Sequence, residues 1–78
     1  MQKLRQDPTL GGNIKRLRNA AGYTQERVVA KLQLEGLSIT RSTYAKIECG
    51  QYSVRVTELV ALKKIFRVDY NAFFDGME

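Results

Sequence analysis

The stretch TRSTYAKIECG, from Thr40 to Gly50, decides the fold of this 78-residue chain. Thr is a favoured helix N-cap and Gly a favoured helix end, so the stretch predicts a helix that runs through about Cys49. Its two large apolar side chains, Tyr44 and Ile47, lie three positions apart and therefore share one face. So narrow an apolar stripe indicates a helix that buries one side and leaves the other in water.

The exposed side of this helix carries small polar side chains and positively charged ones. It carries Arg41, Ser42, Thr43 and Lys46. The DNA major groove is about 12 Å wide and admits one helix, and side chains of these types can contact guanine edges, other base edges or thymine methyl groups. The alternatives without DNA contact are that Arg41 and Lys46 only make the chain more soluble and that Ser42 and Thr43 are present only because they favour a first helical turn.

Four further helices are expected around this one, because apolar residues recur at helical spacing on either side of it. The threonines at 9 and 24 and the aspartate at 69 are expected to cap three of them, whereas the cap of the fourth, at Arg55, is unclear. The segments are residues 10–21, 25–34, 56–66 and 70–74. No segment has the pattern of a strand. The sequence therefore predicts an all-α, compact five-helix domain at residues 9–75, preceded by a flexible arm at residues 1–8.

Charge is distributed unevenly along the chain. Residues 1–55 hold ten Lys/Arg against four acids, giving +6, and residues 56–78 hold three against four, giving −1. This asymmetry suggests a part that faces a polyanion and a neutral supporting part.

Composition argues against several other classes of protein. One cysteine and no histidine exclude an internal disulfide and a Cys/His zinc cluster. We expect no enzyme activity, cofactor or metal, because no nucleophile–base pair or phosphate-cradling glycine loop is visible. No apolar run approaches the roughly 20 residues of a membrane span, and no secretory signal is visible, so we expect a cytoplasmic protein.

Several segments together resemble the phage-repressor and Cro type of helix-turn-helix family, which is lambda-repressor-like. The similar segments are Asn13-Ile-Lys-Arg-Leu-Arg18, Gly22-Tyr-Thr-Gln-Glu26, Arg41-Ser-Thr-Tyr-Ala-Lys-Ile-Glu48 and Val68-Asp-Tyr-Asn-Ala-Phe-Phe74. The resemblance covers roughly residues 10–75. It implies a sequence-specific regulator of transcription, of the repressor class, that binds double-stranded DNA as a homodimer.

The resemblance also implies roles for individual residues. Base readout falls to Arg41, Ser42, Thr43 and Lys46, and a structural ion pair to Arg18 and Glu48. Gln25 matches a glutamine that holds a DNA phosphate and braces the reading helix, although it could be only a solvated first-turn residue. Further phosphate contacts are expected at Thr24, Asn13, Arg16, Gln51 and Tyr52.

One departure from the family pattern and one rival function stay open. The connection from Gln33 to Thr40 is about five residues longer than usual, so the reading helix could be tilted and the added loop could itself reach the DNA backbone. A dimer would have to form around the last two helices, where one of Phe73 and Phe74 is expected to be exposed. The rival function is an antitoxin or adaptor that uses the same fold to bind a protein partner.

Overall fold

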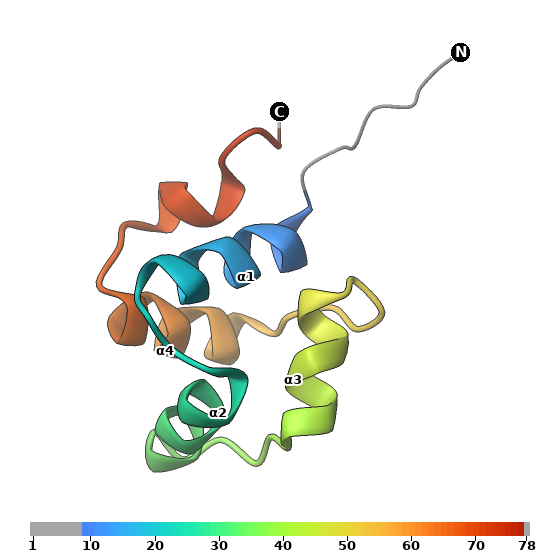
Figure 1. The fold of residues 1–78 in the computed structure, drawn as a ribbon, viewed down its shortest axis with the longest axis vertical. Helices are drawn as coiled ribbons and strands as arrows, with labels where there is room; N and C mark the ends of the chain where they lie inside the picture. Colours follow the sequence, from blue (N-terminus) through green and yellow to red (C-terminus); the bar gives the residue numbers. More distant parts are fainter. Residues whose placement is uncertain (1–8, 78) are drawn as a thin grey trace.

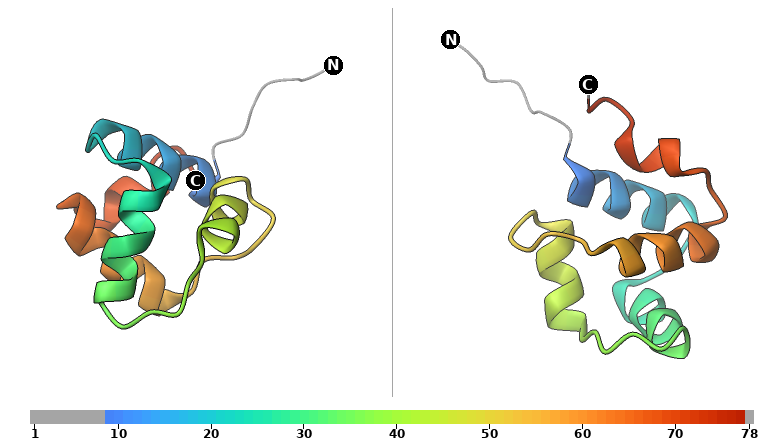
Figure 2. Two further views of the ribbon diagram at one scale, coloured as in Figure 1. Left: turned by 60° about the horizontal axis from the view of Figure 1, so that its bottom comes forward. Right: turned by 180° about the vertical axis from the view of Figure 1, so that it is seen from behind.

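The computed structural model describes residues 9–77, which form four α-helices and one short 3-10 helix (Figure 1). The elements are α1 (Leu10–Ala20), α2 (Gln25–Leu34), α3 (Arg41–Glu48), α4 (Val56–Phe66) and the 3-10 helix η1 (Tyr70–Phe74). α1 packs against α3 and η1, and α2 packs against α3 and α4. Figure 2 shows η1 running beside α1 in the view from behind, with α3 crossing near the start of α1. The arm predicted at residues 1–8 lies outside the described residues.

The all-helical class is confirmed, but the expected count of five α-helices is wrong. The last segment is a 3-10 helix, in which the N–H of Ala72 donates to the carbonyl of Asp69, three residues earlier, over 3.0 Å. The Asp69 side chain makes no capping bond, contrary to the prediction. A five-residue segment is too short for a stable α-helix, and the tighter turn suffices to bury Phe73.

Threonine caps begin three of the helices as the sequence predicts. The side chains of Thr9, Thr24 and Thr40 accept hydrogen bonds from the N–H groups of Gly12, Arg27 and Thr43 over 2.9, 3.1 and 3.2 Å. α4 begins differently: the N–H of Arg55 donates to Glu58 Oε1 over 2.7 Å. A glutamate three residues into the helix thus replaces the cap that the sequence left unclear.

The core is formed by apolar side chains from every helix and from the α2–α3 connection. The buried members are Ile14, Leu17, Val28, Val29, Leu32, Ile39, Tyr44, Ile47, Ala61, Leu62, Phe66 and Phe73. Phe66 and Phe73 stack with ring centroids 6.3 Å apart, which fastens η1 to α4. Phe74 is 45% exposed, so one of the two adjacent phenylalanines faces water, as expected. Within residues 9–77 no helix is long and apolar enough to cross a bilayer.

Gly11 allows the first turn of α1 to lie directly on the last turn of α3. A Cβ atom at this position would overlap the carbonyl oxygen of Ile47 and lie 2.9 Å from that of Glu48. At Gly12 the nearest atom to such a Cβ is the Thr9 hydroxyl oxygen, at 3.1 Å. The two adjacent glycines therefore differ in role: the first is required by a close backbone approach, the second is not.

We expect Gly11→Ala to lower the free energy of unfolding by about 1–3 kcal/mol, because the added methyl group forces α1 and α3 apart. The matched control is Gly12→Ala, whose methyl group meets only the Thr9 hydroxyl oxygen and should change stability by no more than about 1 kcal/mol in either direction. Urea unfolding of the three proteins measures the difference. Equal effects of the two substitutions would contradict the close approach.

Candidate nucleic-acid interface

A buried ion pair joins α1 to α3. Arg18 Nε donates to Glu48 Oε2 over 2.7 Å, and Arg18 Nη2 donates to Glu48 Oε1 over 3.1 Å. The two side chains are only 10% and 2% exposed. Arg18 Nη1 also donates to the carbonyl of Tyr23 over 2.8 Å, in the turn that leads to α2. Arg18 and Glu48, which the resemblance pairs, are thus in bidentate contact, the strongest geometry for such an ion pair.

Gln25 brings α2 to the same carboxylate. Its Nε2 donates to Glu48 Oε1 over 3.0 Å. Side chains from α1 and α2 therefore meet at one residue in the last turn of α3. Because a bidentate arginine and an amide both aim at this carboxylate, they restrict the orientation of α3 relative to the other two helices.

The groups of this cluster shift one another's pKa values. Burial alone would raise the pKa of Glu48, but the hydrogen bonds from Arg18 and Gln25 overcome burial and keep the pKa below its ordinary value. The hydrogen bond to Glu48 raises the pKa of Arg18. Burial, together with the nearby Glu48 carboxylate, raises the pKa of Tyr44, whose hydroxyl lacks a hydrogen-bond partner of good geometry within residues 9–77. Tyr44 is fully buried and so belongs to the core.

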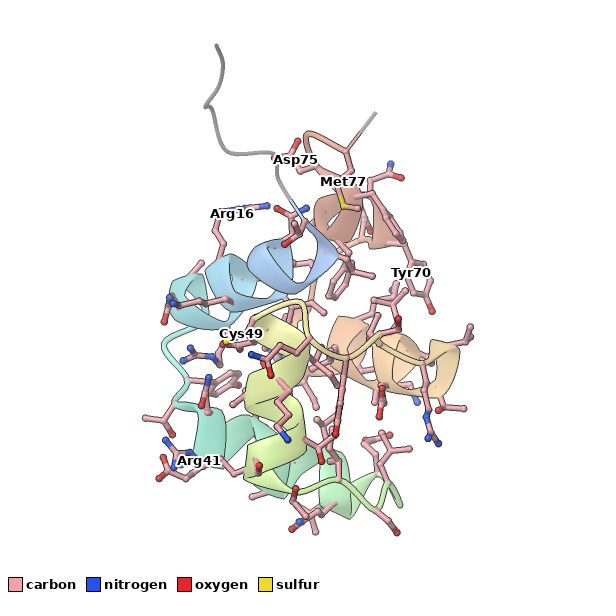
Figure 3. The ribbon with its side chains drawn as sticks, turned by 90° about the vertical axis from the view of Figure 1, so that its right-hand side faces the viewer. Arg16, Arg41, Cys49, Tyr70, Asp75 and Met77 are labelled. Atoms are coloured by element: carbon pink, nitrogen blue, oxygen red, sulfur yellow. The ribbon has the colours of Figure 1, made fainter. Side chains whose placement is uncertain are left out.

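The opposite side of α3 faces solvent. Arg41 and Ser42 are exposed, and Thr43 and Lys46 are half-buried. Figure 3 looks onto this helix, with Arg41 at its beginning and Cys49 directly after its end. The four residues expected to read bases thus lie on one helix whose other face is in the core, and two of them are cationic.

Arg41 is held loosely. Its Nε lies 3.8 Å from Glu26 Oε2, and the two side chains are 61% and 70% exposed. An exposed pair of this kind contributes about 1 kcal/mol or less, so another acceptor can easily replace Glu26. The contact also places the first turn of α2 next to the first turn of α3.

The first turn of α2 contains two of the expected phosphate contacts, Thr24 and Gln25. The Thr24 hydroxyl accepts the capping bond from Arg27, and Gln25 uses one amide hydrogen on Glu48. A helix N-terminus attracts anions through its N–H groups, although the carboxylate of Glu26 opposes that attraction here.

The loop after α3 contains two more expected phosphate contacts, Gln51 and Tyr52, both exposed. Gly50, at φ 81°, turns the chain back toward α3. The backbone N–H groups of Gln51 and Tyr52 both donate to the carbonyl of Lys46, over 2.8 and 3.3 Å. The loop therefore folds back against the C-terminal end of α3.

Asn13 and Arg16, the other two residues expected to contact phosphates, contact the segment around η1. Asn13 is buried, and its Nδ2 donates to the carbonyls of Phe73 and Asp75 over 2.9 and 3.0 Å, so both amide hydrogens are used. Arg16 donates to Asn13 Oδ1 over 3.2 Å and lies 3.8 Å from an Asp75 carboxylate oxygen. Figure 3 shows Arg16 and Asp75 near the end of the molecule opposite Arg41. Both residues attach α1 to the segment around η1.

The long connection between α2 and α3 is anchored at both of its ends. The N–H of Leu37 donates to the carbonyl of Leu32 over 3.2 Å, which closes α2. Gln33 Nε2 donates to the carbonyl of Ile39 over 2.9 Å, and Ile39 is buried. These contacts keep the start of α3 packed against the core.

A polar hollow of about 500 Å³ lies between this connection and the loop after α3. Ser38, Ser53 and Arg55 line it together with residues already discussed. The sequence pattern assigned no binding role to these three residues, because none of them lies within a helical stripe. Only the folding of two loops onto the same side of α3 brings them together.

Comparison with known proteins identifies one match. The family model described as a helix-turn-helix domain matches residues 9–71, which include α1 to α4 and the start of η1. No curated protein and no solved structure matches the chain.

The pair between Arg18 and Glu48 predicts both a stability loss and a pH dependence. Arg18→Ala leaves a buried carboxylate unpaired and should cost about 3–5 kcal/mol, a large part of the 5–15 kcal/mol typical of a domain. Because folding lowers the pKa of Glu48, its contribution is complete above the unfolded value of about 4.3 and is lost as pH falls through the folded value.

Urea unfolding between pH 7 and pH 3 measures both effects. The double variant Arg18→Met, Glu48→Leu should recover much of the stability at neutral pH and lose less of it on acidification than the parent chain. Glu26→Gln, which removes an exposed carboxylate, is the control and should change neither quantity by more than about 0.5 kcal/mol. An unaltered acid dependence in the double variant would contradict the role assigned to Glu48.

Proposed function

This chain belongs to the helix-turn-helix domain family, and on that premise we propose that it is a sequence-specific regulator of transcription. In this proposal α3 lies in the major groove of double-stranded DNA, as in repressors of the phage-repressor and Cro type. Repression is the simplest mode, because a protein that occupies promoter DNA excludes other proteins from it.

The exposed face of α3 is the observation that carries the proposal. Arg41 and Ser42 project from its first turn, and Thr43 and Lys46 follow on the same helix, while Tyr44 and Ile47 are buried behind them. Arginine and lysine donate to guanine O6 and N7, and hydroxyl groups bond either kind of base. We assign base readout to these four residues.

Phosphate contacts are assigned to the two segments that flank α3. They are Thr24 and Gln25 at the start of α2 and Gln51 and Tyr52 in the loop after α3. The Gln25 amide has two hydrogens, and only one of them is donated to Glu48. Gln25 can therefore hold α3 in place and donate its second hydrogen to a DNA phosphate at the same time.

A homodimer is part of the proposal, and exposed apolar side chains support a protein contact. Leu34 and Val56 are 87% and 78% exposed, and Phe74 in η1 is 45% exposed. Two-fold symmetry would place two copies of α3 about one helical turn of DNA apart, roughly 34 Å. The alternative, an antitoxin or adaptor, would use the same side chains on a different protein. Sedimentation of the purified chain, with and without DNA, distinguishes the two. A dimer supports the homodimer, whereas a monomer under both conditions supports binding to a different protein.

Selection of duplexes from a random pool at physiological salt tests the function directly. We expect an enriched motif with two related half-sites, bound at least about 1,000-fold more tightly than random DNA. The affinity should fall as salt rises, because binding releases counterions from the phosphates. Recovery of no motif, with only micromolar and salt-sensitive binding, would falsify sequence-specific reading.

Alanine substitutions on α3 test the readout. Arg41→Ala or Lys46→Ala should weaken the selected duplex by about 1–3 kcal/mol, or roughly 5- to 150-fold, and weaken a scrambled duplex much less. Lys63→Ala removes the same charge from α4 and serves as the control, with little effect on the ratio of the two affinities. If the α3 variants lower both affinities equally, these side chains contact phosphates instead of bases.

A further inference from the structure

Three surface lysines lie over tyrosine rings in the described part of the chain. Lys31 lies 5.3 Å from the centre of the Tyr23 ring, and Lys63 lies 5.3 Å from that of Tyr70. Lys46 lies 5.1 Å from the centre of the Tyr52 ring. Distances of this size are those of cation–π contacts. Of the three lysines, Lys46 belongs to α3, so its contact affects the proposed reading face.

The backbone after α3 determines where the Tyr52 ring lies. Gly50 reverses the chain, and the Lys46 carbonyl then accepts hydrogen bonds from the N–H groups of Gln51 and Tyr52. The lysine is thus held at two points, with its carbonyl on the returning loop and its ammonium group over the ring. Tyr52 is 49% exposed, so the ring lies at the surface where a DNA groove would meet it.

A lysine side chain is long and flexible, and it loses rotamer freedom when it binds a base. A ring that already restricts the ammonium group reduces that loss before DNA arrives, which favours one binding geometry over others. From this geometry we propose that Tyr52 is a positioning residue for Lys46, so that the ring sets how α3 discriminates between base sequences. This inference rests on the proposed function and refines it.

The proposal changes the role of Tyr52. As a phosphate contact, Tyr52 would act through its hydroxyl group, equally on all DNA sequences. As a positioning residue, it acts through the face of its ring, and on the preferred sequence most. Tyr52→Phe keeps the ring and removes the hydroxyl, whereas Tyr52→Leu removes both. The two variants therefore separate the two roles.

The experiment compares the wild-type chain with Tyr52→Leu, Tyr52→Phe and Tyr70→Leu. The probes are the duplex that the wild type selects from a random pool and a scrambled duplex of equal length. We expect Tyr52→Leu to lower the ratio of the two affinities by about two- to fivefold, and Tyr52→Phe to keep both affinities at their wild-type values. Tyr70→Leu removes an equivalent cation–π contact away from α3. It should leave the ratio unchanged, and sedimentation should show the same oligomeric state as the wild type. Figure 3 shows Tyr70 well apart from Arg41.

A second measurement needs no DNA. Protons over the face of an aromatic ring are shifted upfield by its ring current. The side-chain methylene protons of Lys46 should therefore be shifted upfield in NMR spectra of the wild type and of Tyr52→Phe. In Tyr52→Leu they should return to ordinary positions, with the same thermal unfolding midpoint as the wild type.

The outcomes separate this inference from the proposed function. If the wild type enriches no sequence, the proposed function fails and the positioning role fails with it. If it enriches a sequence but Tyr52→Leu keeps the ratio, only the positioning role is overturned. Equal weakening of both duplexes by Tyr52→Phe shows a phosphate contact, and tighter binding by Tyr52→Leu shows that the ring sequesters the ammonium group. Both of these results overturn the positioning role, as does a Lys46 spectrum without the upfield shift.

Discussion

The buried contact between Arg18 and Glu48 is the interaction on which the rest of the structure depends. A carboxylate that is 2% exposed is tolerated only because a bidentate arginine and the Gln25 amide surround it. Those donors come from α1 and α2, and the acceptor lies in the last turn of α3. The orientation of α3 is therefore tied to two other helices by directional bonds, whereas apolar packing alone would allow it to slide.

This constraint explains how a helix of eight residues can present a defined face. The side chains of Tyr44 and Ile47 fix its depth in the core, and Gly11 lets the first turn of α1 rest on its last carbonyls. Six residues separate α2 from α3, and the buried Ile39 and the Gln33 bond to its carbonyl hold the start of α3.

The helical segments could be predicted because their signals are local. Caps act over two or three residues and apolar stripes over four, so both are visible in the order of residues. The prediction failed at the last segment, where the stripe was too short to distinguish an α-helix from a 3-10 helix. The contacts of Asn13 were not visible in the sequence either, because an asparagine on α1 has the same local pattern whether or not it donates to the carbonyls of Phe73 and Asp75.

The sequence by itself determined where the four α-helices begin, the narrow apolar stripe of α3 and the cationic residues on its other side. Tertiary structure alone decided which polar residues remain available at the surface. Arg18 and Glu48 are 30 positions apart, and Asn13 and Phe73 are 60 apart. Whether such residues meet depends on how the helices cross. The helix beginning at Arg41 thus follows from local order, and the surface around it from packing.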